Sequence, residues 1–226
     1  LIGAVFNDGG GTDSGKIYLI FGKATGWAKD TSLSNADASF LGEDNNDYAG
    51  EELGSAGDVN GDGFDDFLIG VMNNPGGGTS RGQTYLILGN TTGWSKNVDL
   101  SNADASFIGS ADFDYSGRLS TTPGDINGDG LDDILIGAPY NDASRADAGQ
   151  TYLILGKASG WTMHTLLVNA DATLRGEATY DFSGRSVTLV GDVDGDGFDD
   201  LLIGAEGATG WAGKAYLVLG KAVGWT

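Results

Sequence analysis

The sequence is poor in residues from which many enzymes build catalytic centres. Its 226 residues include no cysteine and a single histidine, His164, in a loop position with no counterpart in the other repeats described below. The absence of cysteine excludes disulfides and thiolate metal sites, so nothing indicates the redox compartment. Without a second histidine or a Gly-x-Ser-x-Gly motif, a hydrolytic triad lacks support. We therefore expect no enzymatic activity.

Basic residues are also scarce, because 12 Lys and Arg stand against 32 Asp and Glu, a formal charge of −20. Such a charge repels phosphate backbones and anionic lipid surfaces. No apolar run approaches the length of a membrane-spanning segment. We expect no nucleic-acid partner and no membrane insertion. Because the acidic residues recur at fixed spacings, metal binding explains them better than disorder does.

Glycine is abundant, with 40 residues, and it punctuates an internal repeat. Each full period contains four short segments with strand character, separated by clusters of Gly, Asn and Asp. One tripeptide returns every 67 residues, as Leu1-Ile2-Gly3, Leu68-Ile69-Gly70, Leu135-Ile136-Gly137 and Leu202-Ile203-Gly204. The strands predicted in the second repeat are Gly50 to Gly57, Asp66 to Val71, Gln83 to Gly89 and Ala105 to Gly109.

A period of this length with four strands favours one β-propeller blade per repeat. We predict an all-β fold of four-stranded antiparallel blades, with a partial blade at 1–49, blades at 50–116 and 117–183, and a partial blade at 184–226. A β-sandwich need not repeat in sequence, and a β-helix has a much shorter period. Since the first partial blade lacks its innermost strand and the last its outermost, we expect a segment of a longer propeller.

Three nine-residue loops share one acidic pattern, at 58–66, 125–133 and 192–200. Ca²⁺ takes about 6 to 8 oxygen ligands, and Asp or Asn at positions one, three and five can surround one ion. Glycine at position six permits a sharp turn, position seven offers a backbone carbonyl, and the Asp at position nine closes the shell. We predict three Ca²⁺ sites with the ligands Asp58, Asn60, Asp62, Phe64, Asp66, Asp125, Asn127, Asp129, Leu131, Asp133, Asp192, Asp194, Asp196, Phe198 and Asp200.

These loops begin like an EF-hand but end differently. The twelfth position, where an EF-hand needs a bidentate Glu, holds Ile69, Ile136 or Ile203. Ordinary turns remain an alternative, because Asp, Asn and Gly all form turns. Turns do not require carboxylates at positions one, five and nine in three copies, so calcium is favoured. Mg²⁺ fits less well, since it prefers to keep water ligands.

Two further motifs flank the loops. An aromatic-x-Gly motif precedes them, as Tyr48-Ala-Gly50, Tyr115-Ser-Gly117 and Phe182-Ser-Gly184, and Gly137-Ala138-Pro139 follows the second loop. With these motifs the chain resembles the FG-GAP repeats of integrin α-subunit propellers and their bacterial relatives. The resemblance implies a seven-bladed propeller with Ca²⁺ between the first and second strands of a blade. The other copies depart from Gly-Ala-Pro, as Gly3-Ala4-Val5, Gly70-Val71-Met72 and Gly204-Ala205-Glu206.

The tryptophans fall into two groups. Four of them follow a glycine after the third strand of each repeat, and this repetition predicts a structural role at the seams between blades. They are Trp27, Trp94, Trp161 and Trp225. Trp211 lies in the shortened loop between the second and third strands, where the other repeats place Asp13, Ser80 and Asp147. Trp211 is a candidate residue of a binding face. The simpler interpretation is that its side chain packs against the fold.

The leading functional hypothesis is a calcium-stabilised, non-enzymatic module at the cell surface or outside the cell. Its partner would be a protein or glycan ligand bound by the blade-connecting loops, as in adhesion. One alternative is a rigid structural or assembly unit of a large surface protein, with self-association or contact to the remainder of a longer chain. Another is the regulatory propeller of a multidomain hydrolase. A fold alone does not decide among them.

Overall fold

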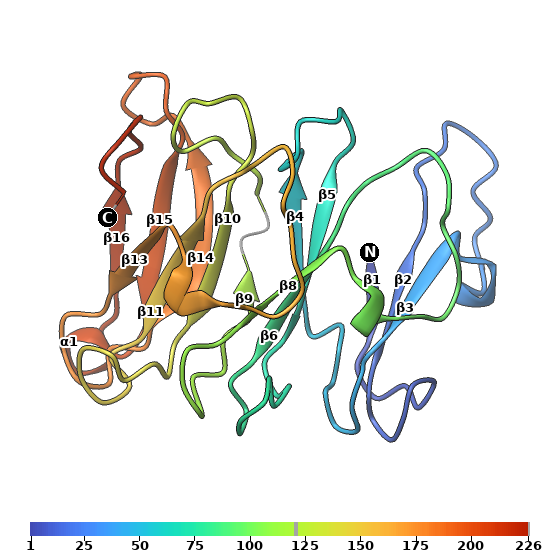
Figure 1. Ribbon diagram of the computed structural model, residues 1–226, viewed down its shortest axis with the longest axis horizontal. Helices are drawn as coiled ribbons and strands as arrows, with labels where there is room; N and C mark the ends of the chain where they lie inside the picture. The colour runs from blue at the N-terminus through green and yellow to red at the C-terminus, as the bar shows by residue number, and fades with distance from the viewer. Residues whose placement is uncertain (120–121, 226) are drawn as a thin grey trace.

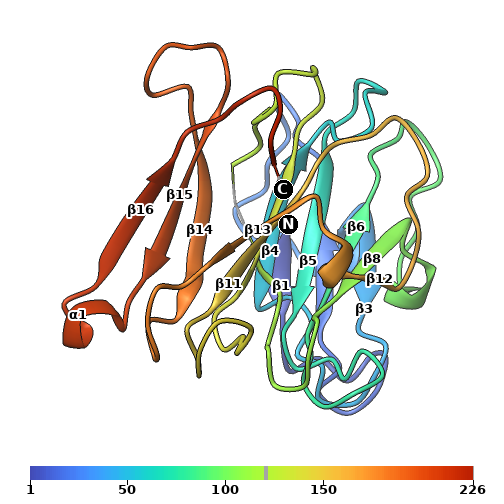
Figure 2. The ribbon, with the colours of Figure 1, turned by 60° about the vertical axis from the view of Figure 1, so that its left-hand side comes forward.

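Four β-sheets lie side by side and make up most of the structure (Figures 1 and 2). The computed structural model describes residues 1–119 and 122–225. We call the sheets blades 1 to 4. Blade 1 contains β1 (Ile2–Ala4), β2 (Lys16–Leu19), β3 (Ala38–Leu41) and β7 (Val98–Asp99). Blade 2 contains β4 (Glu52–Gly57), β5 (Asp66–Val71), β6 (Gln83–Ile87), β8 (Ala105–Ile108) and β12 (Thr165–Leu166).

Blades 3 and 4 continue the row. Blade 3 contains β9 (Arg118–Leu119), β10 (Ile134–Ala138), β11 (Gln150–Ile154) and β13 (Ala172–Arg175). Blade 4 contains β14 (Ser183–Gly191), β15 (Asp200–Ala205) and β16 (Lys214–Val218). Helical turns are short: η1 (Leu33–Asn35), η2 (Leu100–Asn102), η3 (Leu167–Asn169) and α1 (Ala208–Trp211). The predicted all-β fold is confirmed, and no helix in the described ranges has the length and apolarity to cross a membrane.

Each inner blade buries both of its faces. Every residue of β5 is buried, because successive side chains point to opposite sides of the sheet and both sides meet another blade. Ile69 and Val71 belong to the core between blades 1 and 2, whereas Leu68 belongs to the core between blades 2 and 3. A third core, which includes Leu135 and Leu201, fills the space between blades 3 and 4. This explains why these strands read as continuous apolar runs.

The two short strands β7 and β12 were not predicted. Each returns to the preceding blade and pairs in parallel with its outer strand, Val98 with Phe40 and Thr165 with Phe107. Two residues are too few to show an alternating pattern, so these strands leave no signal along the chain. They cover outer edges that would otherwise expose unpaired backbone groups.

The structure corrects the view of His164 as a residue without a counterpart. His164 and Asn97 occupy matching places just before β12 and β7, both with φ of 60°. The His164 amide donates to Ser106 Oγ (2.9 Å), as the Asn97 amide donates to Ser39 Oγ (2.8 Å). His164 therefore fills a repeated structural position.

The aromatic-x-Gly motif marks the closest approach between blades. A methyl group added to Gly137 would overlap the carbonyl oxygen of Gly184 in the next blade, and Gly70 meets Gly117 in the same way. The glycine of this motif also adopts a backbone conformation that other residues avoid, since Gly117 has a φ of 129°. Glycine in both motifs thus sets the spacing of the blades.

Three of the four repeated tryptophans pack at seams, as predicted. Trp94 stacks on Phe67 of its own blade, with centroids 6.2 Å apart, and meets Phe21 of blade 1 edge-on at 5.8 Å. Trp161 packs against the core between blades 2 and 3, and Trp225 against the core between blades 3 and 4. Trp27 differs, because 58% of its surface is exposed.

The glycine contact between blades 3 and 4 leads to a stability prediction. We expect Gly137→Ala to lower the free energy of unfolding by about 2 kcal/mol or more, because a backbone oxygen cannot move aside as a flexible side chain can. Gly22→Ala is the matched control, since nothing lies within 4 Å of the added methyl group. Urea denaturation followed by circular dichroism measures both variants, and equal stabilities would contradict the proposed spacing role.

Candidate metal centres

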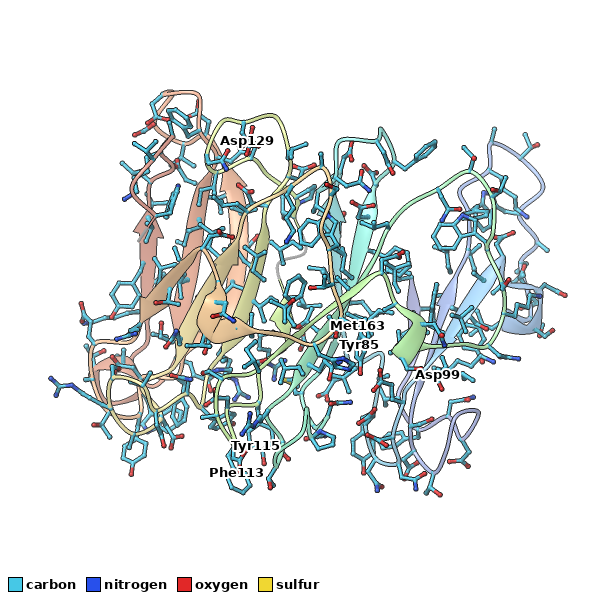
Figure 3. The ribbon with its side chains drawn as sticks, in the orientation of Figure 1. Tyr85, Asp99, Phe113, Tyr115, Asp129 and Met163 are labelled. Atoms are coloured by element: carbon cyan, nitrogen blue, oxygen red, sulfur yellow. The ribbon has the colours of Figure 1, made fainter. Side chains whose placement is uncertain are left out.

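The three acidic loops occupy the same place in successive blades. Each joins the first strand of a blade to its second: β4 to β5, β9 to β10, and β14 to β15. Figure 3 shows Asp129 of the second loop at one end of the sheets, and Phe113 and Tyr115 at the opposite end. The strand-loop-strand arrangement predicted for the loops is therefore the observed one.

The aspartate at position one organises each loop. Asp58 Oδ1 accepts hydrogen bonds from the amides of Gly61 (2.7 Å) and Asp62 (3.0 Å), and Oδ2 accepts one from Gly63 (2.8 Å). Asp125 and Asp192 repeat this pattern in the other loops. One carboxylate thus gathers three backbone donors and bends the loop around itself.

The aspartate at position nine ties the loop to the sheet. Asp66 Oδ2 accepts from the amide of Val59 (3.0 Å), and Oδ1 accepts from Gly89 at the end of the third strand (2.7 Å). Asp133 and Asp200 make the corresponding bonds. All three residues are buried. Each carboxylate oxygen retains a second lone pair, so these bonds leave the oxygens able to bind a cation.

Burial shifts the acidity of two of these groups. Desolvation raises the pKa of Asp66 to about 6 and the pKa of Asp133 to about 7. Backbone hydrogen bonds from Gly89 and Gly156 oppose these shifts, and the other loop carboxylates add to them by repulsion. A bound cation would offset both the repulsion and the cost of burying the charge.

The third loop brings three carboxylates together. Asp192, Asp194 and Asp200 each offer an oxygen, and these atoms lie within 4.8 Å of one another. Two oxygens on one Ca²⁺ can be no more than about 5 Å apart, twice the Ca–O distance, so the trio fits this ion. In the first two loops position three is Asn60 or Asn127, which replaces one carboxylate by an amide oxygen.

Positions five and seven take on additional contacts. Asp196 is not part of the close trio, and its Oδ1 accepts from the amide of Phe198 (3.0 Å), as Asp62 Oδ1 does from Phe64 (3.0 Å). The side chains at position seven contact the preceding loop, since Leu131 lies against Gly61 and the Phe198 ring lies against Gly128. The carbonyl ligands at position seven stay a prediction.

Sequence reasoning missed the aspartate at position eight. Asp132 Oδ2 accepts a hydrogen bond from the amide of Asp58 in the preceding loop (2.8 Å), and Asp199 Oδ2 accepts one from Asp125 (3.0 Å). The available signal was the Asp-Asp pair that ends all three loops. Only the neighbouring loop gives the first member of the pair its partner.

A row of aromatic rings crosses blades 2 to 4 at the other end of the sheets. We call Tyr115, Tyr140, Phe182 and Trp211 the aromatic row. Adjacent ring centroids lie 5.4 Å, 5.4 Å and 5.7 Å apart. Tyr115 and Tyr140 also line a hollow of about 470 Å³, together with Arg118 and Arg185. Trp211 is 70% exposed.

Comparison with known proteins identifies the repeats. The FG-GAP repeat family matches residues 52–87, 118–154 and 183–218. Integrin alpha-V of Gallus gallus is 31% identical over 204 residues, 86% of this chain and 17% of the relative. Integrin alpha-8 of Mus musculus is 32% identical over 62% of this chain and 14% of the relative. Integrin alpha-PS5 of Drosophila melanogaster is 32% identical over 71% of this chain and 16% of the relative.

These matches complete the account of the fold. Each matched segment begins in or beside the first strand of a blade, spans the acidic loop, and ends at the third strand. The sheets are therefore blades of a β-propeller, as predicted. The chain spans less than a fifth of the length of the curated relatives it matches.

The raised pKa values predict how the cation-free protein responds to pH. Burial also raises the pKa of Asp47 to about 6. The carboxylates of Asp47, Asp66 and Asp133 therefore bind protons more tightly in the folded protein than in the unfolded protein. The free energy of unfolding should therefore fall as the pH rises from about 4 towards 7, and level off above the folded pKa values. We expect a lower Tm at pH 8 than at pH 6 in EDTA.

Asp133→Asn should reduce this difference in Tm, because an amide does not ionise. Asp30→Asn, in an exposed loop, provides the control. Thermal denaturation followed by circular dichroism gives the comparison, and a Tm that rises from pH 6 to pH 8 would refute the prediction.

Proposed function

Since the chain is an FG-GAP repeat protein, we propose that it is a calcium-stabilised, non-enzymatic binding module that acts at the cell surface or outside the cell. The observation that supports this most directly is the separation of two chemistries on one scaffold. Oxygen-rich loops lie at one end of the blades, and the aromatic row lies at the other. The first would hold cations, and the second would hold a ligand.

The donor set favours Ca²⁺ at each loop. We assign as ligands the side chains at positions one, three, five and nine and the carbonyl at position seven, in all three loops. All of these donors are oxygens, which suits a hard cation, and no cysteine or histidine competes. When bound, Ca²⁺ supplies positive charge where carboxylates crowd together. The chain contributes the turn geometry, since the amides of Gly61 and Gly63 already hold Asp58 in place.

The aromatic row supports ligand binding. Aromatic rings supply large contact areas at low cost in side-chain entropy, and Tyr and Trp add a hydrogen-bonding group. Trp211 has φ of 72°, in the left-handed region where the other repeats use Asp13, Ser80 and Asp147. Short polar residues tolerate this conformation better than tryptophan does. An exposed, strained and unrepeated tryptophan is a reason to place the ligand there.

The relatives point to the biological setting. Three integrin alpha chains share the repeats, which supports a role in cell adhesion with a protein or glycan as partner. Because the chain covers a small part of those proteins, adhesion, surface location and the identity of the partner are proposals. The aromatic row and its hollow are where we place the contact.

Calcium stabilisation can be measured directly. We expect millimolar CaCl₂ to raise the Tm and EDTA to lower it again, because binding to the folded state alone adds about 2.7 kcal/mol per site at a hundredfold excess over Kd. Asp129→Ala should lose part of this gain, whereas Asp30→Ala should keep all of it. A Tm that does not respond to CaCl₂ would contradict calcium binding.

Ligand binding can be tested with an array of glycans and extracellular matrix proteins in CaCl₂. We expect a bound ligand whose affinity falls about tenfold or more in Trp211→Ala, as is typical of an exposed aromatic anchor. Trp27→Ala is the control, because Trp27 is 58% exposed and lies outside the aromatic row. If no ligand binds on the array and the protein self-associates when Ca²⁺ is present, the alternative of a rigid structural or assembly unit is favoured instead.

A further inference from the structure

Neighbouring acidic loops are joined by direct hydrogen bonds across the seam between blades. The Asp58 amide donates to Asp132 Oδ2 (2.8 Å), and the Asp132 amide donates back to the Asp58 carbonyl (3.2 Å). The same pair of bonds links Asp125 with Asp199, both at 3.0 Å. We call each pair of bonds a seam clamp. A clamp connects the first residue of one loop with the eighth residue of the next.

A second connection runs beside each clamp. The Lys157 amide donates to the Val59 carbonyl in the first loop (2.9 Å). Its neighbour Gly156 donates to Asp133 Oδ1 in the second loop (2.7 Å). Two adjacent amides of one strand end therefore hold both loops. Lys221 and Gly220 repeat this arrangement between the second and third loops.

Burial within the loops reflects these connections. The residue at position two is fully buried in the first two loops, where Val59 and Ile126 each expose 0% of their surface. In the third loop Val193 is 53% exposed. Val59 and Ile126 belong to the cores between successive blades, so each of the first two loops is anchored against the blade that follows it.

We propose that Asp132 and Asp199 are positioning residues that make cation binding by successive loops cooperative. This rests on the proposed calcium function. Asp132 bonds to Asp58, the first predicted ligand of one site, and directly precedes Asp133, the last predicted ligand of the next. A cation that orders one loop therefore fixes part of the other site, and the second cation meets a smaller ordering cost. The clamp carboxylate also offsets repulsion between neighbouring cations.

Asp65 provides a matched control within the chain. It occupies position eight of the first loop, is exposed, and has no side-chain hydrogen bond to any residue that the structure describes. Replacing Asp65 removes the same chemical group from the same loop position without breaking either of the clamps that join the three loops. Any difference between Asp65→Ala and Asp132→Ala therefore reports on the clamp itself.

The test is a Ca²⁺ titration of the whole chain against a chromophoric chelator. We expect a Hill coefficient above 1 in the unaltered protein and in Asp65→Ala, and a value closer to 1 in Asp132→Ala and Asp199→Ala. Coupling of this kind amounts to about a fivefold or larger gain in affinity for the second ion. Circular dichroism checks that each variant is folded.

Hydrogen exchange of the unaltered protein gives a second measurement that needs no variant. As Ca²⁺ is added, amides of 58–66 and 125–133 should gain protection at the same concentration. Three results would overturn the coupling and leave calcium binding intact. They are a Hill coefficient of 1 in the unaltered protein, different Ca²⁺ midpoints for the protection of the two loops, and a Hill coefficient that falls as far in Asp65→Ala as in Asp132→Ala. An absence of Ca²⁺ binding would overturn the proposed function and the coupling with it.

Discussion

The close approach of successive blades is the constraint on which the other features depend. Glycine meets glycine backbone at the seams, as Gly70 does with Gly117 and Gly137 with Gly184. At this separation the apolar strands bury both faces, which supplies the main stabilising term. The same spacing brings Asp132 within hydrogen-bond distance of Asp58, and it sets the rings of the aromatic row 5.4 Å to 5.7 Å apart. Core, acidic loops and aromatic row are consequences of one repeated contact.

The repeat made the strands and the acidic loops predictable, because the same residues recur at a fixed spacing and within one blade. The four strands predicted in the second repeat agree with β4, β5, β6 and β8 to within two residues at each end. What the sequence could not reveal depends on contacts between blades. The short strands β7 and β12 are defined by the edge they cover, and Asp132 is defined by the amide of Asp58. Neither relation leaves a periodic pattern along the chain.

The sequence left turn chemistry and metal chemistry as alternatives for the loops, and the structure makes them compatible. Asp58 accepts three backbone hydrogen bonds, which is turn chemistry, and it does so with the carboxylate assigned to the cation. A cation would thus meet a loop whose backbone is already bent, and the ordering that it adds would fall on the ligand side chains and on the bonds between neighbouring loops. This differs from small zinc domains, in which metal binding and folding are one event. Here the apolar cores hold the blades, and calcium would add to that stability.

The two ends of the blades differ in how much variation they permit. At the acidic end, the proposed cation sites need several oxygens from each loop, and positions one, five and nine are Asp in all three copies. At the other end, the turn between the second and third strands requires one residue with a positive φ. The four repeats place Asp13, Ser80, Asp147 and Trp211 there. A change at that turn disturbs neither a cation ligand nor a seam clamp. In the proposed function, ligand preference can therefore vary at the aromatic end while the acidic loops and their seam clamps stay unchanged.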